Sequence, residues 1–401
     1  MPLNSSSDSS KSSESSNKSG MQGVSQSETW TIKRAFEWTR DYLTQKGDEQ
    51  ARLSTEWLLS HACGLSRIDV YTQFDKPLSV DERAHLRETV RRRAAGEPLQ
   101  YIVGEAGFRH LTLEVRPGVL IPRPETEVLV DLALEALPDP EEGIQLHVLD
   151  LCTGSGCVGL SLAFERPDVS VIATDICPEA VSLANDNALT NNLSSRFLAI
   201  EADLFEPRET DHRGTLHSPH TEYIGQFDDP LLRSVLSHPY GQSRTDSQQL
   251  DLPEQREAEL RGSSAHSAEE DEGTKPVVRR GRAEYPLVQP LHFDLIVSNP
   301  PYIPAAGMDA LPKEVADFEP ALALDGGEDG LDIARRILEQ APSYLKESSY
   351  LIQELDVRNV ALAVDFAVQL NTYKSVNTAS DLTGRVRFVL TEGVPAQKPQ
   401  K

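Results

Sequence analysis

The chain lacks the features that would place it in a membrane or in a disulfide-bonded secreted domain. Its 401 residues contain no apolar run near the roughly 20 residues that a membrane-spanning helix needs. The ten histidines form no metal-site spacing. Neither a metal-ligand pattern nor a disulfide framework is visible in the four cysteines, Cys63, Cys152, Cys157 and Cys177. We therefore expect no metal site, no membrane span and a reducing compartment.

The chain also lacks an excess of basic residues. Its 63 acidic and 39 basic side chains give a formal net charge of −24. A protein that binds nucleic acid through the phosphates normally carries a basic surface, so this balance argues against direct nucleic-acid binding. A basic protein partner is compatible with the charge.

Three segments lack sustained apolar periodicity. Residues 1–28 are rich in serine, and residues 207–289 are rich in Ser, His, Pro, Gln, Arg and Glu. We expect disorder in both, with a short tail at 393–401. The insertion begins just after Asp203 and ends just before Asn299, so a lid over a site is the functional alternative. Residues 1–28 contain no arginine and therefore match an Arg-rich transit peptide poorly.

Between residues 122 and 392, short apolar strands alternate with helical patterns. Pro124 is expected to open the first of these helices. The alternation predicts an α/β fold, with a seven-stranded, mainly parallel sheet covered by helices on both faces. The strands are expected near residues 146–151, 169–174, 197–201, 293–298, 349–354, 370–376 and 385–391.

Two smaller regions precede this domain. Residues 29–104 carry apolar residues at helical spacing and predict a small helical domain, whose last long helix ends in the basic run 91–93. Such a run is usually a solvated helix end favoured by the macrodipole. Residues 105–121 predict a hairpin linker, in which 111–115 alternate, a Pro-Gly turn follows, and 119–121 return.

The most informative motif is Asn299-Pro-Pro-Tyr302, which follows an apolar strand. A conjugated NH2 is a poor nucleophile, because its lone pair is delocalised. Methylating such a nitrogen requires acceptors that hold both N–H bonds, and the Asn299 side-chain oxygen and the Pro300 carbonyl suit that task. The two prolines fix the local backbone, and Tyr302 can lie against a flat amide or base. A plain Pro-rich turn is the alternative.

A second motif lies at residues 148–159, where an apolar strand runs into a Gly-rich turn and then a helix. Glycines let the backbone approach a ligand, and the helix N-terminus offers free N–H groups. The spacing from Gly154 to Gly159 matches a dinucleotide fingerprint, with Asp175 about 20 residues on. S-adenosylmethionine sites use a similar turn and add an acid at the end of the first strand, here Asp150. At this point both cofactors remain open.

Three acids, Asp150, Asp175 and Asp203, follow three successive strands. In a doubly wound sheet those strand ends share one edge, where ligands bind. We expect Asp150 to face the cationic end of the cofactor, Asp175 its ribose hydroxyls and Asp203 its adenine amino group. A single such acid is more often a helix cap or a loop residue.

Taken together, these motifs resemble the release-factor glutamine methyltransferases, the PrmC or HemK family. The resemblance implies a class I S-adenosylmethionine-dependent methyltransferase of Rossmann-like fold. It also implies a substrate, the glutamine in the Gly-Gly-Gln loop of class I peptide-release factors. The resemblance covers residues 30–206 and 290–392, with motifs at 96–104, 119–127, 152–156, 298–303, 318–327 and 384–388.

The resemblance also implies the site. The target glutamine is held by Asn299, Pro300, Pro301 and Tyr302. The cofactor site comprises Cys152, Thr153, Gly154, Ser155, Gly156, Asp175, Leu204 and Asn299, to which the pattern of acids at strand ends adds Asp150 and Asp203. Cys152 replaces the usual first glycine of the turn, which is tolerable if its φ stays negative. Leu204 offers no ring to stack on adenine.

Three hypotheses remain at this point. The first is a protein-glutamine methyltransferase, and the second is a nucleic-acid adenine-N6 methyltransferase with the same Asn-Pro-Pro-Tyr grip. The third is an NAD-binding oxidoreductase or an inactive binding module, which leaves residues 299–302 unexplained. We expect a monomer. The two-domain form resembles the organellar enzymes of eukaryotes, and the long insertion is typical of a eukaryotic chain, which suggests a mitochondrial location with the cytoplasm as the alternative.

Overall fold

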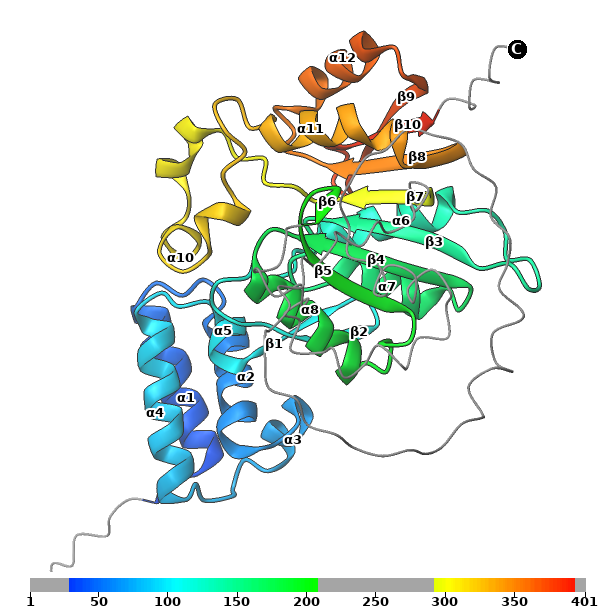
Figure 1. Ribbon diagram of the computed structural model, residues 1–401. Helices are drawn as coiled ribbons and strands as arrows, with labels where there is room; N and C mark the ends of the chain where they lie inside the picture. The colour runs from blue at the N-terminus through cyan, green and yellow to red at the C-terminus, as the bar shows by residue number, and fades with distance from the viewer. Residues whose placement is uncertain (1–28, 208–291, 394–401) are drawn as a thin grey trace, which may run out of the picture. The chain divides into compact units, whose positions relative to one another are not determined.

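The computed structural model describes residues 29–207 and 292–393 (Figure 1). The predicted N-terminal tail and nearly all of the predicted insertion and C-terminal tail lie outside the described residues. The chain forms two compact units, Met1–Ala95 and Gly96–Lys401. Within the described ranges, no helix combines the length and apolar character required to cross a bilayer.

The first unit is helical, as predicted. Helix α1 packs against α2 and α4 around buried Leu43, Leu58 and Leu59. Ser79 and Glu82 form a capping box at the start of α4, which fixes where that helix begins. The helices are α1 (Ile32–Gln45), α2 (Ala51–Cys63), α3 (Arg67–Thr72) and α4 (Val80–Ala94).

The basic run at the end of α4 is only partly a solvated helix end. Arg91 forms an exposed ion pair with Glu88 at 2.6 Å. Arg93 instead lies inside the unit, where its guanidinium Nε is 2.9 Å from the Asp48 carboxylate and both side chains are largely buried. The interpretation as a solvated basic patch is therefore wrong for Arg93.

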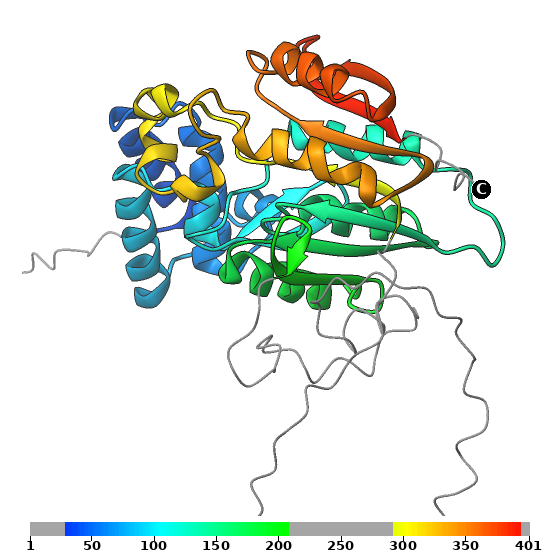
Figure 2. The same ribbon diagram turned by 45° about the horizontal axis from the view of Figure 1, so that its top comes forward.

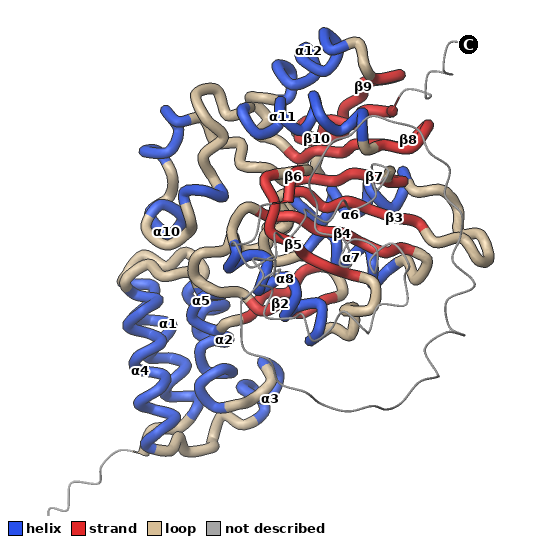
Figure 3. The backbone as a smooth tube through the Cα atoms, in the orientation of Figure 1, coloured by secondary structure: helices blue, strands red, loops and turns tan. Residues whose placement is uncertain are grey.

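The second unit contains one large sheet, shown in red in Figure 3. All seven predicted strands are present, and a two-residue strand extends the sheet by one. The spatial order is β6-β5-β4-β3-β7-β8-β10-β9, with parallel pairing from β5 to β8 and antiparallel pairing elsewhere. The strands are β3 (Leu146–Leu151), β4 (Val169–Asp175), β5 (Phe197–Asp203), β6 (Glu206–Pro207), β7 (Phe293–Ser298), β8 (Leu345–Glu354), β9 (Tyr373–Ser380) and β10 (Val386–Gly393).

Helices cover both faces of this sheet (Figures 1 and 2). One core cluster joins α6, α7 and α8 to strand residues such as Val148 and Val297. The neighbouring strand residues Leu149 and Ile296 point into the opposite cluster, with α11 and α12. The helices are α6 (Thr126–Ala136), α7 (Cys157–Glu165), α8 (Pro178–Thr190), α10 (Lys313–Ala316), α11 (Asp332–Gln340) and α12 (Val360–Leu370), with 3-10 turns at Ala305–Ala310, Ala321–Ala323 and Ala341–Ser343. The predicted α/β fold is confirmed, although α6 begins at Thr126 rather than at Pro124.

The hairpin before the sheet has a different register from the predicted one. Strands β1 (Glu105–Phe108) and β2 (Leu111–Glu114) pair antiparallel, with Phe108 opposite Leu111. The turn therefore lies at Arg109, and the predicted return strand at 119–121 is wrong. Exposed and buried residues alternate along β1, as expected for a strand with one covered face.

Residues 115–121 do not pair with β2 and instead contact the short helix α5 (Leu99–Val103) and its C-cap, Gly104. The Val115 N–H donates to the Gly104 carbonyl, and the Tyr101 hydroxyl donates to the Val119 carbonyl at 2.6 Å. Tyr101 also packs with Val115 and Ile121. Helix α5 thus belongs to the second unit, which begins before the predicted domain end at residue 104.

Arg109 ties the hairpin to the helices. Its φ of 49° places it in the left-handed region that the tight turn requires. Its guanidinium donates to Glu165 at 2.6 and 2.9 Å and to Asp131 at 2.7 Å. The Arg109 and Glu165 side chains are only 13% and 16% exposed, so this pair is well shielded from water.

We expect Arg109→Ala to lower the free energy of unfolding by roughly 2 kcal/mol, because it leaves the shielded Glu165 carboxylate without its partner. Arg358→Ala is the control, since Arg358 is exposed and pairs with Asp356 two residues away. Its loss should cost under about 1 kcal/mol. Urea unfolding monitored by circular dichroism measures both, and equal effects would contradict the role assigned to Arg109.

Candidate active site

The predicted site residues lie at one edge of the sheet. The carboxyl ends of β5, β4, β3 and β7 carry, in that order, Asp203, Asp175, the turn at 152–156 and the loop at 299–302. Leu151 and Ser298 pair at the ends of β3 and β7, and the Ser298 hydroxyl donates to the Leu151 carbonyl at 2.9 Å. The Gly-rich turn and Asn299 therefore start side by side.

The Asn299 side-chain amide is held by α6. Its Nδ2 donates to the Thr126 hydroxyl oxygen at 3.0 Å. Thr126 is the first residue of α6 and is buried. Because this bond uses an N–H of the amide, the side-chain oxygen is kept as an acceptor for a ligand. Thr126 was not among the predicted site residues, although it lies in the 119–127 motif.

A glycine-rich loop at 326–330 supports the backbone of the Asn-Pro-Pro-Tyr segment. A Cβ on Gly326 would lie 2.8 Å from the Pro301 carbonyl oxygen, so only glycine allows this close approach. Asn359 donates to the Tyr302 carbonyl at 2.9 Å. The carbonyls of residues 301 and 302 thus face this support. Among the described residues, no hydrogen bond to the Pro300 carbonyl is found.

Tyr302 is more enclosed than its predicted role requires. Its ring packs on the cluster that contains Leu331, Leu355 and Val389. Burial raises the pKa of its phenol to about 12, the nearby Glu354 adds to the shift, and Arg387 opposes it. The phenol therefore stays neutral at physiological pH. Stacking of its ring on a target amide stays a prediction.

The Gly-rich turn is fixed by the strand beside it. The Thr153 N–H donates to the Thr174 carbonyl at 3.0 Å, and the Gly154 N–H donates to the Asp175 carboxylate at 2.9 Å. Cys152 has a φ of 58°. The expectation of a negative φ is therefore wrong: the turn needs the left-handed conformation here, and Cys152 adopts it at a steric cost of roughly 1–2 kcal/mol.

Gly156 is the N-cap of helix α7 and shows why the turn contains glycine. Its φ is +84°, and a Cβ there would meet Leu160, Ala184 and Phe197 at 3.0–3.2 Å. By contrast, a Cβ on Gly154 would have only Val119 near it, at 3.9 Å. The turn is thus packed against the core at Gly156 and has room beside Gly154, where a ligand can approach its backbone.

Asp150 has a different role from the predicted one. Its side chain is 1% exposed, and its Oδ2 accepts from the Thr153 hydroxyl at 2.7 Å and from the Gly159 N–H at 3.0 Å. Burial raises its pKa to about 7, against these two hydrogen bonds. The carboxyl therefore holds the turn to α7, and the predicted contact with the cationic end of the cofactor is not what this geometry favours.

Asp175 accepts the Gly154 and Cys177 N–H groups, one on each oxygen, and stays half-buried. A carboxylate has lone pairs beyond these two bonds, so it can also accept ribose hydroxyls. Asp203 forms an ion pair with Arg336 of α11 at 2.9 Å, which competes with the predicted adenine contact. Leu204 is only 6% exposed and belongs to a core cluster, which leaves little of it to line a cofactor site.

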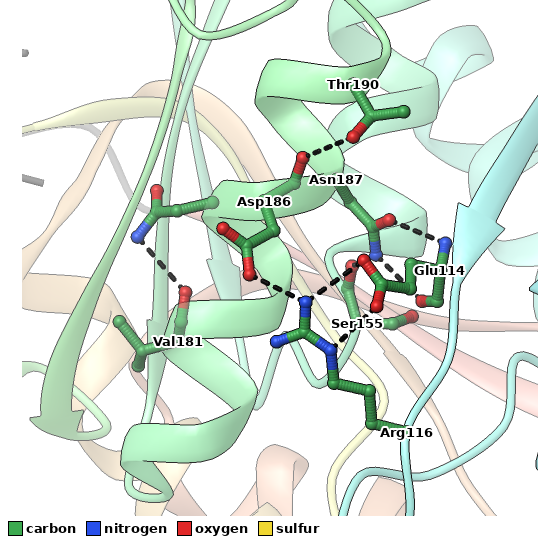
Figure 4. Close-up of polar contacts among 8 residues, drawn as sticks. Glu114, Arg116, Ser155, Val181, Asp186, Asn187 and Thr190 are labelled. Atoms are coloured by element: carbon green, nitrogen blue, oxygen red, sulfur yellow. Dashed lines mark hydrogen bonds and ion pairs between the residues drawn. The ribbon is translucent and has the colours of Figure 1, made fainter. Parts of the chain in front are cut away.

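Asn187 of α8 is a supporting residue that sequence reasoning missed (Figure 4). Its amide is fully buried and donates to the carbonyls of Ser155 in the turn and Glu114 in β2, at 3.0 and 3.1 Å. Its oxygen accepts the Glu114 N–H at 2.7 Å. Beside it, Arg116 bridges Glu114 and Asp186. One amide thus joins the hairpin, the helix and the turn.

The residues present fit S-adenosylmethionine. The turn has open space beside Gly154, Asp175 supplies the acid for ribose, and the fixed Asn299 amide lies at the next strand end. A fold of this topology with this site defines an S-adenosylmethionine-dependent methyltransferase. The Asn-Pro-Pro-Tyr loop is the part that an NAD-binding oxidoreductase would leave without a role.

Comparison with known proteins gives the family. Residues 34–104 match the PrmC N-terminal domain, and residues 126–215 match the methyltransferase small domain. A release factor glutamine methyltransferase of Geobacter sulfurreducens is 38% identical over 330 residues, which cover 82% of this chain and 86% of that protein. A protein of the same name from Rhodopirellula baltica is 30% identical over 376 residues, or 92% and 98% of the two chains. The chain belongs to the release factor glutamine methyltransferase family.

The glycine loop behind the Asn-Pro-Pro-Tyr segment gives a steric prediction. A Cβ on Gly330 would lie 2.4 Å from both the Tyr302 carbonyl oxygen and the Asn359 amide nitrogen. Gly330→Ala should therefore destabilise the protein and displace the loop, with a loss of activity. Gly384→Ala is the matched control, because Gly384 has nearly the same φ, +80° against +79°, but open space around it. It should cost only about 1–2 kcal/mol and keep activity.

Thermal unfolding and methyl transfer measured on both variants test this assignment. Gly330→Ala activity equal to that of Gly384→Ala would show that the loop does not support the site.

The buried Asp150 predicts a dependence of stability on pH. Its pKa is about 7 in the fold against 3.8 in the unfolded chain, so folding favours the protonated form. Its contribution to the free energy of unfolding is full below pH 3.8, falls as the pH rises towards 7 and is constant above. Asp150→Asn removes this dependence, and its stability relative to the wild type should rise between pH 5.5 and 8.

Urea unfolding at the two pH values checks the sign. Asp356→Asn is the control, because Arg358 lowers the pKa of Asp356 and its titration lies below this window. A constant difference between wild type and Asp150→Asn would contradict the assignment.

Proposed function

We propose that this protein transfers a methyl group from S-adenosylmethionine to the side-chain nitrogen of the glutamine in the Gly-Gly-Gln loop of a class I peptide-release factor. The observation that carries the proposal is the Asn299 amide. Its nitrogen is held by Thr126, so its oxygen stays an acceptor next to the cofactor turn. The names of the bacterial relatives supply the substrate class.

The target amide has two N–H bonds and needs two acceptors. The Asn299 oxygen supplies one, and the Pro300 carbonyl supplies the other, since the next two carbonyls face Gly326 and Asn359. Both acceptors come from a segment whose prolines and supporting loop fix the backbone. The chain therefore aims the nitrogen before the reaction, and positioning of this kind is worth at most about 7–11 kcal/mol of the barrier.

When bound, S-adenosylmethionine supplies a methyl group on a sulfonium, which leaves as a neutral thioether. The target nitrogen forms the new N–C bond and loses one proton to water. No dedicated base is required, because the alkylated amide is acidic. Asp175 and the turn at 152–156 would hold the cofactor, with Asp150 keeping that turn in shape.

An adenine-N6 methyltransferase would need the same two acceptors. The net charge of −24 and the names of the relatives count against it. A class I release factor as the partner, a monomeric state and no direct nucleic-acid contact are parts of our proposal. A mitochondrial location, with the cytoplasm as the alternative, stays a prediction from the sequence.

The first test is a labelled methyl-transfer assay with S-adenosylmethionine and a mitochondrial class I release factor, followed by peptide mass spectrometry. Methyl on the Gly-Gly-Gln glutamine is the expected result. Methyl on an adenine of added DNA or RNA, and none on the protein, would favour the alternative.

Asn299→Ala separates turnover from cofactor binding. We expect kcat to fall on the order of 100-fold, because one preorganised partner of the reacting group is lost. Cofactor affinity should stay within a few-fold, as measured by calorimetry. Asp175→Asn is the counterpart and should weaken cofactor binding more than it lowers kcat at saturation. The reverse pattern in the two variants would exchange the roles we assign.

A further inference from the structure

Glu354, at the end of β8, is buried without a hydrogen-bond partner. Its side chain is 1% exposed, and neither carboxyl oxygen has such a partner among the described residues. Buried carboxyls usually have hydrogen-bond partners, because removing a carboxyl from water without such a partner costs free energy. Glu354 lies at the strand end next to β7, which leads into Asn299. Its position therefore points to a role in the site.

The surroundings of Glu354 act on its pKa in opposite directions. Arg387 is the nearest cation, at 3.8 Å, and is itself 3.3 Å from Asp381. Burial raises the pKa of Glu354 to about 7, Glu125 adds to the shift, and Thr126 and Arg387 oppose it. The charged and titratable groups that face it are Arg387 on β10, Glu125 before α6, Tyr302 in the site loop and Cys157 on α7.

Thr126 connects Glu354 to the site. Its oxygen already accepts the Asn299 Nδ2 hydrogen at 3.0 Å. A hydroxyl that accepts one bond still has its own hydrogen to donate. Helix α6, which begins at Thr126, packs against β8, which ends at Glu354. Thr126 opposes the rise of the Glu354 pKa, yet no hydrogen bond joins the two groups in the structure.

We propose that Thr126 and Glu354 form a buried relay that fixes the Asn299 amide with its oxygen towards the target. An ionised carboxylate only accepts hydrogen bonds, so it draws the Thr126 hydrogen to itself. The Thr126 oxygen must then accept, and only the NH2 end of Asn299 can donate to it. Thr126 and Glu354 are positioning residues, since neither touches the target. The inference rests on the proposed function, because it explains how that site aims its acceptor.

The relay should make turnover depend on pH. Protonated Glu354 has a hydrogen of its own to donate to the Thr126 oxygen, where it competes with Asn299. The amide then loses its fixed orientation. Turnover should therefore rise with pH as Glu354 ionises and level off above that range.

The first arm of the test uses Thr126. Thr126→Val keeps the shape of the side chain but removes the hydroxyl, and we expect kcat to fall roughly 10-fold because a buried hydrogen bond is lost. Thr126→Ser keeps the hydroxyl and should retain most of the turnover. Cofactor affinity and thermal stability are measured in parallel. Equal kcat in the two variants, with both folded, overturns the proposal.

The second arm uses Glu354→Gln, whose amide oxygen can accept the Thr126 hydrogen at every pH. The rise in kcat between pH 6 and 8 should flatten in this variant and persist in Asp150→Asn. The comparison matters because Asp150 also has a pKa of about 7. A rise that persists in Glu354→Gln, or that flattens in Asp150→Asn instead, overturns the proposal.

The third arm of the test observes the Asn299 side-chain amide in the absence of substrate. The Asn299 side-chain NH2 signal is observed in asparagine-labelled protein and assigned by its loss in Asn299→Ala. We expect it to shift with pH in the wild type and to lose that shift in Thr126→Val and Glu354→Gln. An unmoved signal overturns the relay even if methyl transfer is normal. A signal that behaves as expected in a protein that does not methylate release factors refutes the proposed function alone.

Discussion

The parallel pairing of β3 with β7 is the contact on which the site depends. These strands come from segments on either side of residues 208–291, yet they run side by side from Val148 and Leu295 to Leu151 and Ser298. Strands that run parallel end at the same edge, so the cofactor turn and Asn299 emerge together. The sheet therefore creates the site by bringing together two segments that are distant in the sequence.

The rest of the second unit holds those two segments rigid. Asn187 of α8 donates to the Ser155 carbonyl in the turn, and the Asp150 carboxyl joins the turn to α7 by accepting the Gly159 N–H. On the other side, Gly326 and Asn359 support the loop that presents Pro300. A reaction that depends on positioning needs this support, because small displacements of the reacting groups are costly. The supporting contacts are backbone carbonyls and buried amides, which have few alternative partners.

Much of this arrangement could be predicted from the sequence. The strands at 146–151 and 293–298 begin and end where their apolar patterns do, and the edge that gathers the three acids follows from strand order. The tasks of individual side chains were harder to predict. Asp150 holds its own turn instead of facing the cofactor. Asp203 pairs with Arg336 and Leu204 packs in the core, because both respond to neighbours from other parts of the chain. Residues 115–121 likewise form no return strand, because Gly104 and Tyr101 bond to the backbone of Val115 and Val119.

Two buried carboxyls near the site, Asp150 and Glu354, show why burial alone does not assign a role. Burial raises the pKa of both to about 7, yet their surroundings differ. Asp150 accepts two hydrogen bonds from its own turn, so its carboxyl is committed to local structure. Glu354 has Arg387 at 3.8 Å but no hydrogen-bond partner among the described residues, and Thr126, which opposes the rise of its pKa, already accepts from Asn299. A buried acid that its surroundings leave unsatisfied costs stability, and such a cost is expected where the group is needed for function.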